Sequence, residues 1–401
     1  MNAWLSVVGI GEDGLAGLSP AARTAVADAQ TLVGGRRHLS YVPDGPAERL
    51  VWASPLAGTL DEIAARRGSR VVVLASGDPM WFGAGATLAR RFGPDEMRVM
   101  PHVSAFALAA ARMAWPIADC TALSVHGRPM AALALHLADR ARLLLLTHDG
   151  LTPAAVAGFL AARGFGASLL VAIERAGGPA EKRLEATAAG WPHARVDELN
   201  VLAVECIAGP DARPLPRIAG LPDDCFEHDG QITKRIVRAA TLAALAPLPG
   251  QLLWDVGAGN GTVAVEWLRS ATGLRAIAVE RDAGRRGRIA RNAETLGVPD
   301  IEIAAGEAPS ALAGLDAPDA VFVGGAVSKP GVLDACWAAL KAGGVLVSNA
   351  VTLEGEAALA AFHAAHGGAL SRIAVSHAES IGAGRGWRAA MPVVQLAARK
   401  P

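Results

Sequence analysis

The chain has 401 residues, more than one hydrophobic core usually supports, and this length predicts two domains of about 200 residues each. Hydrophobic residues make up 52% of the chain and charged residues 19%, a composition that excludes a globally disordered protein. The 38 basic residues balance the 38 acidic ones, so no net field attracts the chain to nucleic acid or to an anionic membrane.

The first half alternates strand-like runs with alanine-rich helical segments, a pattern typical of an α/β fold. Strands are predicted at residues 5–10, 71–75, 143–147 and 169–173. Helices are predicted at residues 20–29, 84–91, 105–113 and 153–163, several of them introduced by Ser, Thr or Pro.

A proline-rich segment separates the two halves. Residues 208–225 contain four prolines, which are too dense for a helix or a central strand. We therefore predict a first domain at residues 1–209, a linker at 210–225 and a second domain at 226–401. In the second domain, helices are predicted at residues 232–245, 262–270 and 283–296, and strands at 252–256, 275–280, 320–323 and 345–348.

The segment LLWDVGAGNGTVAVEWL combines an apolar strand that ends at Asp255, a glycine turn and a helix. Gly257, Gly259 and Gly261 form GxGxG, which permits positive φ angles and lets a ligand approach main-chain N–H groups at the helix amino terminus. The next strand ends in Glu280, whose carboxylate can accept hydrogen bonds from the ribose hydroxyls of a nucleoside. The spacing lacks the last glycine of GxGxxG, so it favours S-adenosylmethionine over NAD. A dehydrogenase and a structural turn without a ligand are the alternatives.

Five segments of the second half resemble, in order, the corrin-pathway C15 methyltransferase and decarboxylase domain: FEHDGQITKRIVRA, WDVGAGNGTVAVE, GEAPSAL, DAVFVGGAV and SNAVTLE. The resemblance covers nearly all of residues 226–401 and implies a Rossmann-like class I methyltransferase fold, with Gly324 and Gly325 close to the methyl donor. The residues that it implies around the cofactor are Thr233, Asp255, Gly257, Ala258, Gly259, Asn260, Gly261, Glu280, Gly306, Glu307 and Ala308. The segment VGGA stands where amino-directed nucleic-acid methylases usually carry an Asn/Asp-Pro-Pro-aromatic signature, which disfavours these enzymes.

The motifs of the first half, VVGIGEDG and LASGDPMWFGAG, are common turn sequences when each is taken alone. Together with PHVSAFALAAARMAWP and LSVHGRP, they are similar to the tetrapyrrole methylase superfamily, in particular to the corrin C5 methyltransferase, over most of residues 1–209. The resemblance implies a two-lobed α/β domain whose cleft holds the cofactor against Gly77, Asp78, Pro79, Ser104 and Ala105.

The residues that contact the substrate are less specified. His126 and Arg128 are candidates in the first domain, with a histidine at a strand end and a solvated arginine as the alternatives. In the second domain His228 is a candidate to position or protonate the substrate. Cations for the substrate carboxylates come from a larger set, for each of which a solvated surface role is the alternative: Lys234, Arg235, Arg238, Arg385 and Arg388.

The favoured hypothesis is a bifunctional enzyme that binds one S-adenosylmethionine per domain. The resemblance implies methylation of precorrin-6Y at C5 and C15, with decarboxylation of the C12 acetate to give precorrin-8, in cobalamin biosynthesis. The alternatives are a nicotinamide-dependent reductase of the same pathway and a fusion in which one half is a non-catalytic binding module.

The expected surroundings follow from the sequence and the resemblance. The four cysteines lie far apart without a CxxC pair, so we predict no metal site and a reducing, cytoplasmic location. No signal peptide precedes the first strand, and no apolar stretch approaches the roughly 18 residues of a membrane helix. We expect a precorrin tetrapyrrole as the partner, neither nucleic acid nor membrane, and a homo-oligomer, dimer or tetramer, by resemblance only.

Overall fold

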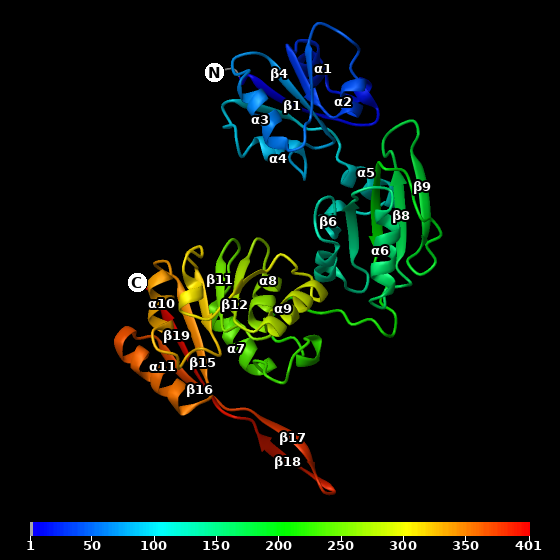
Figure 1. Ribbon diagram of the computed structural model, residues 1–401. Helices are drawn as coiled ribbons and strands as arrows, with labels where there is room; N and C mark the ends of the chain where they lie inside the picture. Colours follow the sequence, from blue (N-terminus) through cyan, green and yellow to red (C-terminus); the bar gives the residue numbers. More distant parts are fainter. Residues whose placement is uncertain (1–2) are drawn as a thin grey trace. The chain divides into compact units, whose positions relative to one another are not determined.

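The structure is a computed structural model that describes residues 3–401 (Figure 1). The chain divides into two compact units. The first consists of the chain up to Arg128 together with Ala138–Pro214, and the second consists of Pro129–Leu137 and Leu215–Pro401. Both units are α/β, as predicted. Within the described residues, no helix is at once long and apolar enough to cross a membrane.

The first lobe of the first unit is built on a parallel five-stranded sheet in the order β3-β2-β4-β1-β5. Its strands are β1 (Leu5–Ile10), β2 (Thr31–Gly34), β3 (Glu48–Val51), β4 (Val71–Ser76) and β5 (Met97–Met100). Its helices are α1 (Pro20–Ala27), α2 (Arg36–Ser40), α3 (Leu56–Ala64) and α4 (Ala84–Leu88), with a 3-10 turn at Gly14–Gly17. The central strands β1 and β4 are apolar on both faces because two separate core clusters cover the two sides of the sheet.

The second lobe contains a mixed sheet in the order β6-β7-β10-β8-β9, in which only the β6–β7 pair is parallel. Its strands are β6 (Cys120–Ser124), β7 (Arg142–Leu146), β8 (Leu169–Glu174), β9 (Lys182–Thr187) and β10 (Asn200–Glu205). Its helices are α5 (Ala105–Met113) and α6 (Thr152–Ala161), with a 3-10 turn at Ile117–Asp119. Ser104 caps α5 by accepting the N–H of Ala107, which fixes where this helix begins.

The second unit contains a seven-stranded sheet in the order β13-β12-β11-β14-β15-β19-β16. Its strands are β11 (Leu252–Val256), β12 (Arg275–Glu280), β13 (Glu302–Ala305), β14 (Ala320–Val323), β15 (Val345–Ala350), β16 (Ala369–Ile373) and β19 (Val393–Arg399). Its helices are α7 (Arg235–Leu245), α8 (Thr262–Ser270), α9 (Ala283–Thr295), α10 (Val332–Ala339) and α11 (Leu353–His366). Three 3-10 segments complete it: Met130–His136, Asp223–Cys225 and Ser310–Leu312.

Helices cover both faces of this sheet. Alternate side chains of β11 enter two different cores: Trp254 packs with α10 and α11, whereas Leu253 packs with α7, α8 and α9. The strands β11 to β15 are parallel, while β19 runs antiparallel to both of its neighbours. Because the strand order reverses between β11 and β14, a crevice is expected at the carboxyl ends of these two strands.

A two-stranded hairpin of β17 (Ser376–Ile381) and β18 (Gly384–Ala389) extends away from the seven-stranded sheet (Figure 1). Its strands pair only with each other, and nearly all of its residues are exposed. The hairpin therefore contributes little to the core of the second unit.

Candidate active sites

The loop between β11 and α8 lies at the point where the strand order of the second unit reverses, which is where open α/β sheets bind ligands. Gly257, Gly259 and Gly261 have φ angles of 68°, 59° and 76°, a conformation that favours glycine. A Cβ atom on Gly257 would lie 3.2 Å from the backbone nitrogen of Gly325, and one on Gly261 would lie 2.9 Å from Ile289. A Cβ on Gly259 would meet no described atom within 4 Å, so the loop leaves open space at its centre.

Two buried carboxylates support this loop. Glu280, at the end of β12, accepts the N–H of Gly259 at 2.8 Å and that of Asp282 at 2.9 Å. Since a carboxylate has about four acceptor sites, Glu280 keeps capacity for two further donors. Asp255 accepts the N–H of Ala264 in the first turn of α8 at 3.0 Å, and its other oxygen has no partner among the described residues. Burial raises the pKa of Asp255 to about 7, and the nearby Glu280 carboxylate adds to the rise.

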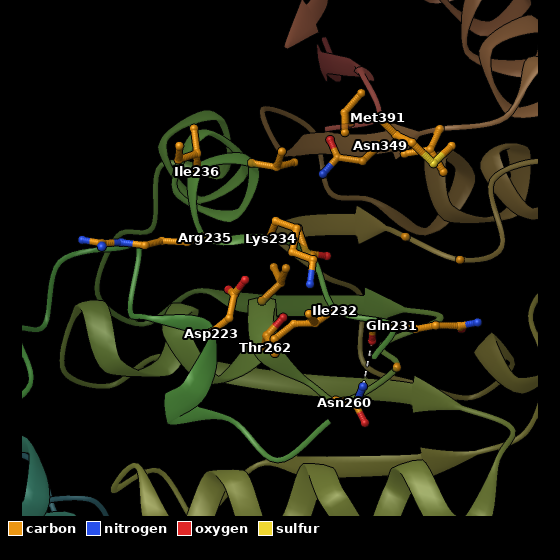
Figure 2. Close-up of a pocket in the computed structure, with 18 of the residues that line it drawn as sticks. Asp223, Gln231, Ile232, Lys234, Arg235, Ile236, Asn260, Thr262, Asn349 and Met391 are labelled. Carbon is orange, nitrogen blue, oxygen red and sulfur yellow. Dashed lines mark hydrogen bonds between the residues drawn. The ribbon is translucent and has the colours of Figure 1, made fainter. Parts of the chain in front are cut away.

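Asn260 connects the glycine loop to the segment that precedes α7. Its Nδ2 donates to the backbone oxygen of Gln231 at 2.8 Å, the contact drawn as a dashed line in Figure 2, and to Asp229 at 3.2 Å. Arg285 also binds Asp229, at 2.9 Å. The hydrogen bonds from Asn260 and Arg285 hold the pKa of Asp229 well below its usual range. The buried Oδ1 of Asn260 has no partner among the described residues.

These features fit a nucleoside cofactor such as S-adenosylmethionine. Glu280 offers free acceptor sites for ribose hydroxyls, Gly259 leaves room at the amino end of α8, and the Asn260 Oδ1 is an orphaned acceptor that a ligand donor would satisfy.

A cavity of about 1040 Å³ opens beside the loop, and Figure 2 shows a close-up of residues that line it. Most of its wall is apolar, and it runs from the glycine loop to the ends of β15, β16 and β19. The residues that line it are Asp223, Gln231–Val237, Gly257–Asn260, Thr262, Val263, Arg285, Phe322, Gly324, Gly325, Asn349, Val351, Ile373, Val375, His377, Ala390, Met391 and Val393.

In the first unit, Gly77 follows β4 and has a φ angle of 56°. Its N–H donates to Ile10 at 3.1 Å, and its carbonyl oxygen accepts the N–H of His102 at 3.2 Å. A Cβ on Gly77 would lie 3.1 Å from the Cα of Ser104. A small cavity of about 70 Å³ lies at this point, and its wall includes Gly77 and Ala105. The ends of β1 and β4 therefore meet the start of α5 at a close backbone approach.

Comparison with known proteins bears on both units. The family of Tetrapyrrole (Corrin/Porphyrin) Methylases matches residues 5–190, and the Precorrin methyltransferase domain matches residues 224–400. A Precorrin-6Y C(5,15)-methyltransferase (decarboxylating) of Sinorhizobium sp is 49% identical over 398 residues, which are 98% of this chain and 96% of that protein. The chain belongs to the precorrin-6Y C(5,15)-methyltransferase (decarboxylating) family.

Two shorter relatives are each named for one reaction. A Cobalt-precorrin-7 C(5)-methyltransferase of Salmonella typhimurium is 36% identical over 42% of this chain and 82% of that protein. A Probable cobalt-precorrin-6B C(15)-methyltransferase (decarboxylating) of Pyrobaculum calidifontis is 38% identical over 34% of this chain and 71% of that protein. The two reactions in the family name thus also occur as names of separate, smaller proteins.

The structure of this precorrin-6Y methyltransferase family member brings part of the predicted second site together. Thr233, Arg235, Gly257–Asn260, Gly324 and Gly325 all line the large cavity, whereas Asp255, Gly261 and Glu280 are not part of its wall. Glu280 supports the loop through its hydrogen bond to Gly259.

Other predicted residues lie outside the cavity wall. His228 is exposed, and its Nδ1 accepts the N–H of Gly230 at 3.0 Å. Gly306, Glu307 and Ala308 follow β13: Glu307 forms an ion pair with Lys329 at 2.9 Å, and Ala308 is buried in a hydrophobic core. No wall residue of the large cavity comes from this loop.

The five candidate cations for the substrate carboxylates differ in whether they line the large cavity. Arg238 is fully buried, forms ion pairs with Glu266 at 2.7 Å and Asp223 at 3.1 Å, and cannot reach a ligand. Arg385 and Arg388 lie on the exposed hairpin outside the wall. Of the five candidate cations, Lys234 and Arg235 line the cavity.

In the first unit, Gly77 and Ala105 line the small cavity, while Asp78, Pro79 and Ser104 stand beside it. Asp78 accepts the N–H of Met80 at 2.9 Å, which forms the turn after β4. The candidates for the substrate, His126 and Arg128, are exposed and lie outside this wall. The His126 ring stands 5.0 Å from that of His148, and the Arg128 guanidinium lies 4.5 Å from the centre of the Phe82 ring.

Sequence reasoning missed a polar cluster in the wall of the small cavity. Glu12 and Arg37 line this cavity, and the largely buried carboxylate of Glu12 accepts hydrogen bonds from Arg37 and from the Tyr41 hydroxyl, with Arg175 3.5 Å away. Burial and, after it, the hydrogen bond to Glu12 raise the pKa of Tyr41, against the opposing effect of Arg37. Arg37 and Tyr41 lie four residues apart, on α2 and at its C-cap, but no spacing in the sequence links them to Glu12 or Arg175, which follow β1 and β8.

Proposed function

We propose that the chain methylates precorrin-6Y at C5 and C15 and removes the C12 acetate carboxyl group as carbon dioxide, giving precorrin-8 in cobalamin biosynthesis. The observation that carries the proposal is the full-length match to a relative named for both methylations and the decarboxylation. The relatives' names give no support to the reductase alternative.

The first unit is proposed to methylate C5, and the second to methylate C15 and decarboxylate. The support is that the tetrapyrrole methylase match lies in the first unit apart from Pro129–Leu137, whereas the precorrin methyltransferase match lies in the second. The sequence resemblance and the names of the two shorter relatives point to the same division.

Each unit is proposed to bind one S-adenosylmethionine, which when bound supplies an electrophilic methyl group on sulfur. In the second unit, Glu280 would hold the ribose, and Gly257 to Asn260 would cradle the cofactor at the start of α8. In the first unit, Gly77 and Ala105 would form the cofactor wall, with Asp78, Pro79 and Ser104 supporting it.

The main contribution of the protein is to align the carbon that is methylated with the methyl group of the cofactor. A bridging carbon of a reduced tetrapyrrole is an enamine-like nucleophile, so holding it in line with the methyl group can supply several kcal/mol as effective concentration. The mostly apolar wall of the large cavity would displace water around a bound macrocycle, and Gly324 and Gly325 carry no side chain between the glycine loop and the rest of the cavity. This chemistry needs no nucleophilic triad.

We also propose a fold type for the second unit, a cellular location and an oligomeric state. We propose a Rossmann-like class I methyltransferase fold for the second unit, supported by its strand order and the glycine loop. We propose a cytoplasmic location, because the four cysteines lie far apart in the sequence without a CxxC pair. A homo-oligomer, dimer or tetramer, is proposed from the resemblance, and light scattering of the purified chain tests it.

Mass spectrometry of the product tests the function. The full chain, incubated with precorrin-6Y and S-adenosylmethionine, is expected to add two methyl groups and remove one carbon dioxide. Gly77→Arg and Gly259→Arg should each abolish one methylation only. Gly314→Arg is the matched control for Gly259→Arg, because both glycines have positive φ and open space at Cβ, and Gly314 lies outside the cavity wall. A product changed only by hydrogen would contradict the proposal.

A further inference from the structure

The cationic residues of the large cavity lie on one side of its wall, near the glycine loop and α7. Three wall residues carry lysine or arginine side chains: Lys234, Arg235 and Arg285. Arg235 donates through Nε to the backbone oxygen of Gly220 at 2.8 Å, and Arg285 is bound to Asp229 and to the Gln231 side chain. Of the three cationic side chains, the Lys234 ammonium group alone has no hydrogen bond or ion pair to any residue within 3–401, although the Lys234 backbone oxygen accepts the N–H of Arg238. Its ammonium group is therefore available to a ligand.

Local structure explains why Lys234 is placed there. It is the last residue before α7 and has extended backbone angles (φ −64°, ψ 148°), so it lies outside the helix. Arg238 accounts for this geometry, because its guanidinium donates to the carbonyl oxygen of Thr233 from inside the core. In Figure 2, Lys234 is drawn between Thr262 on one side and Asn349 on the other.

The end of the cavity farthest along the strand order from the glycine loop is mostly apolar, and Asn349 and His377 are its polar wall residues. It is formed by Val351, Ile373, Val375, Met391 and Val393, which belong to the ends of β15, β16 and β19 or to their flanks. Register places Ile373 opposite Val393, and Ala350, which precedes Val351, pairs with Val394, which follows Val393, so the ends of β15, β16 and β19 meet here. No lysine, arginine or acidic residue of the described wall lies on these strand ends.

The rate of carbon dioxide loss depends on whether the departing carboxylate lies beside a cation or against an apolar wall. When the bond between the methylene carbon and the carboxylate carbon breaks, its electron pair moves to the methylene carbon and into the conjugated ring. Carbon dioxide leaves, and a proton from water completes the methyl group. A cation beside the departing carboxylate stabilises the ground state and slows the step, whereas an apolar, desolvating wall favours the neutral product.

We propose that the large cavity sorts the carboxylates of the macrocycle: Lys234 binds a carboxylate that is retained, and the apolar patch of Val351, Ile373, Val375, Met391 and Val393 receives the acetate that is lost. This inference rests on the proposed function and assigns the place of decarboxylation within it. Arg235 and Arg285, already bonded to the protein, form the remaining cationic wall.

The first arm of the test concerns Lys234. Lys234→Met should raise the KM for carbon dioxide release about ten- to a hundredfold, because a charge-assisted hydrogen bond is lost, and should change kcat less. Lys234→Arg should restore most of the affinity, and the effect should shrink at high salt. Lys341→Met is the matched control, since Lys341 is half-exposed, pairs with Asp319 and lies outside the cavity wall.

The second arm concerns the patch. Val351 is 49% exposed, so Val351→Lys places an ammonium group there without disturbing a buried core. At saturating substrate it should slow carbon dioxide release about tenfold or more, while C15 methylation continues and a methylated, undecarboxylated product accumulates. Val351→Met, which keeps the wall apolar, should behave like the wild type.

The outcomes separate this inference from the proposed function. If the wild-type chain neither methylates precorrin-6Y nor releases carbon dioxide, the proposed function fails. If the wild type performs both reactions but Lys234→Met keeps the wild-type KM, or Val351→Lys decarboxylates at the wild-type rate, the sorting of carboxylates is wrong while the function stands. Binding of precorrin-6Y in the presence of S-adenosylhomocysteine, followed by absorbance, checks the Lys234 effect without turnover.

Discussion

At the residue scale, Asp255 shows how the glycine loop is held. Asp255 is 1% exposed, and its Oδ2 accepts the N–H of Ala264 in the first turn of α8. Its Oδ1 has no partner among residues 3–401. Leaving a buried carboxylate oxygen unsatisfied is costly when the group is ionised. This cost is the physical reason why the protonated form is favoured up to about pH 7.

The stability of the second unit should depend on pH through Asp255. Its pKa rises from 3.8 to about 7 on folding, so the folded state binds the proton more tightly. The resulting stabilisation is complete below about pH 4 and is lost as the pH rises through about 7. Asp255→Asn keeps an oxygen for Ala264 and cannot ionise. The free energy of unfolding of the wild type, relative to that of the variant, should fall over this range by a few kcal/mol as an order of magnitude. Melting temperatures of the two proteins, measured as a function of pH, follow this difference. A difference that stays constant with pH would contradict this reading.

At the element scale, a buried ion pair joins α7 and α8. Arg238 on α7 contacts Glu266 on α8, and both side chains are at most 2% exposed. Glu266 also accepts the N–H groups of Gly220 and Leu221, at 2.6 Å and 2.9 Å. The pair thereby fixes the proline-rich segment and the residue before α7, which both border the cavity.

Removing the arginine should destabilise the second unit. Arg238→Met leaves the Glu266 carboxylate buried without its cation, and the free energy of unfolding in urea should fall by about 3–5 kcal/mol. The matched control is Arg275→Met, which breaks the exposed pairs with Glu302 and Asp316 and should cost about 1 kcal/mol or less. Similar losses for the two variants would show that burial does not set the strength of this contact.

The hairpin of β17 and β18 should be dispensable for stability. Its strands pair only with each other, and Ile381 and Trp387 are 66% and 78% exposed. Replacing residues 377–388 by two glycines should therefore change the melting temperature by only about 2 °C or less, because little apolar area is lost from the core. Differential scanning calorimetry measures this, and a drop of about 10 °C would mean that the hairpin packs more tightly than its exposure indicates.

Sequence patterns predicted the central elements well because local chemistry defines them. The strands β1, β11, β12 and β14 and the helices α5 and α8 have the predicted bounds, since apolar runs, caps and glycine turns mark both ends. The helix predicted from residue 232 begins at Arg235 instead, because Lys234 is extended. The strands β16 and β19 were not predicted. Buried Gln395 interrupts the apolar run of β19, and only pairing makes it acceptable, because Gln395 donates to Asn349 at 3.0 Å.

At the scale of the whole molecule, each unit has its own hydrophobic clusters and its own candidate site. The glycine loop and Glu280 could be predicted because they are close in sequence. The far end of the large cavity could not, because Val351, Ile373 and Val393 meet only through strand pairing between distant segments. Nor could the Glu12 cluster, because Glu12 meets Arg37 and Arg175 only through long-range contacts.

The central claim is that two separate cofactor sites exist, one in each unit. Titration of the intact chain with S-adenosylhomocysteine by calorimetry tests it most directly. The account predicts two binding sites for the wild type and for Gly314→Arg, and one for each of Gly77→Arg and Gly259→Arg. A single site on the wild type, or the loss of both sites in one folded variant, would contradict it.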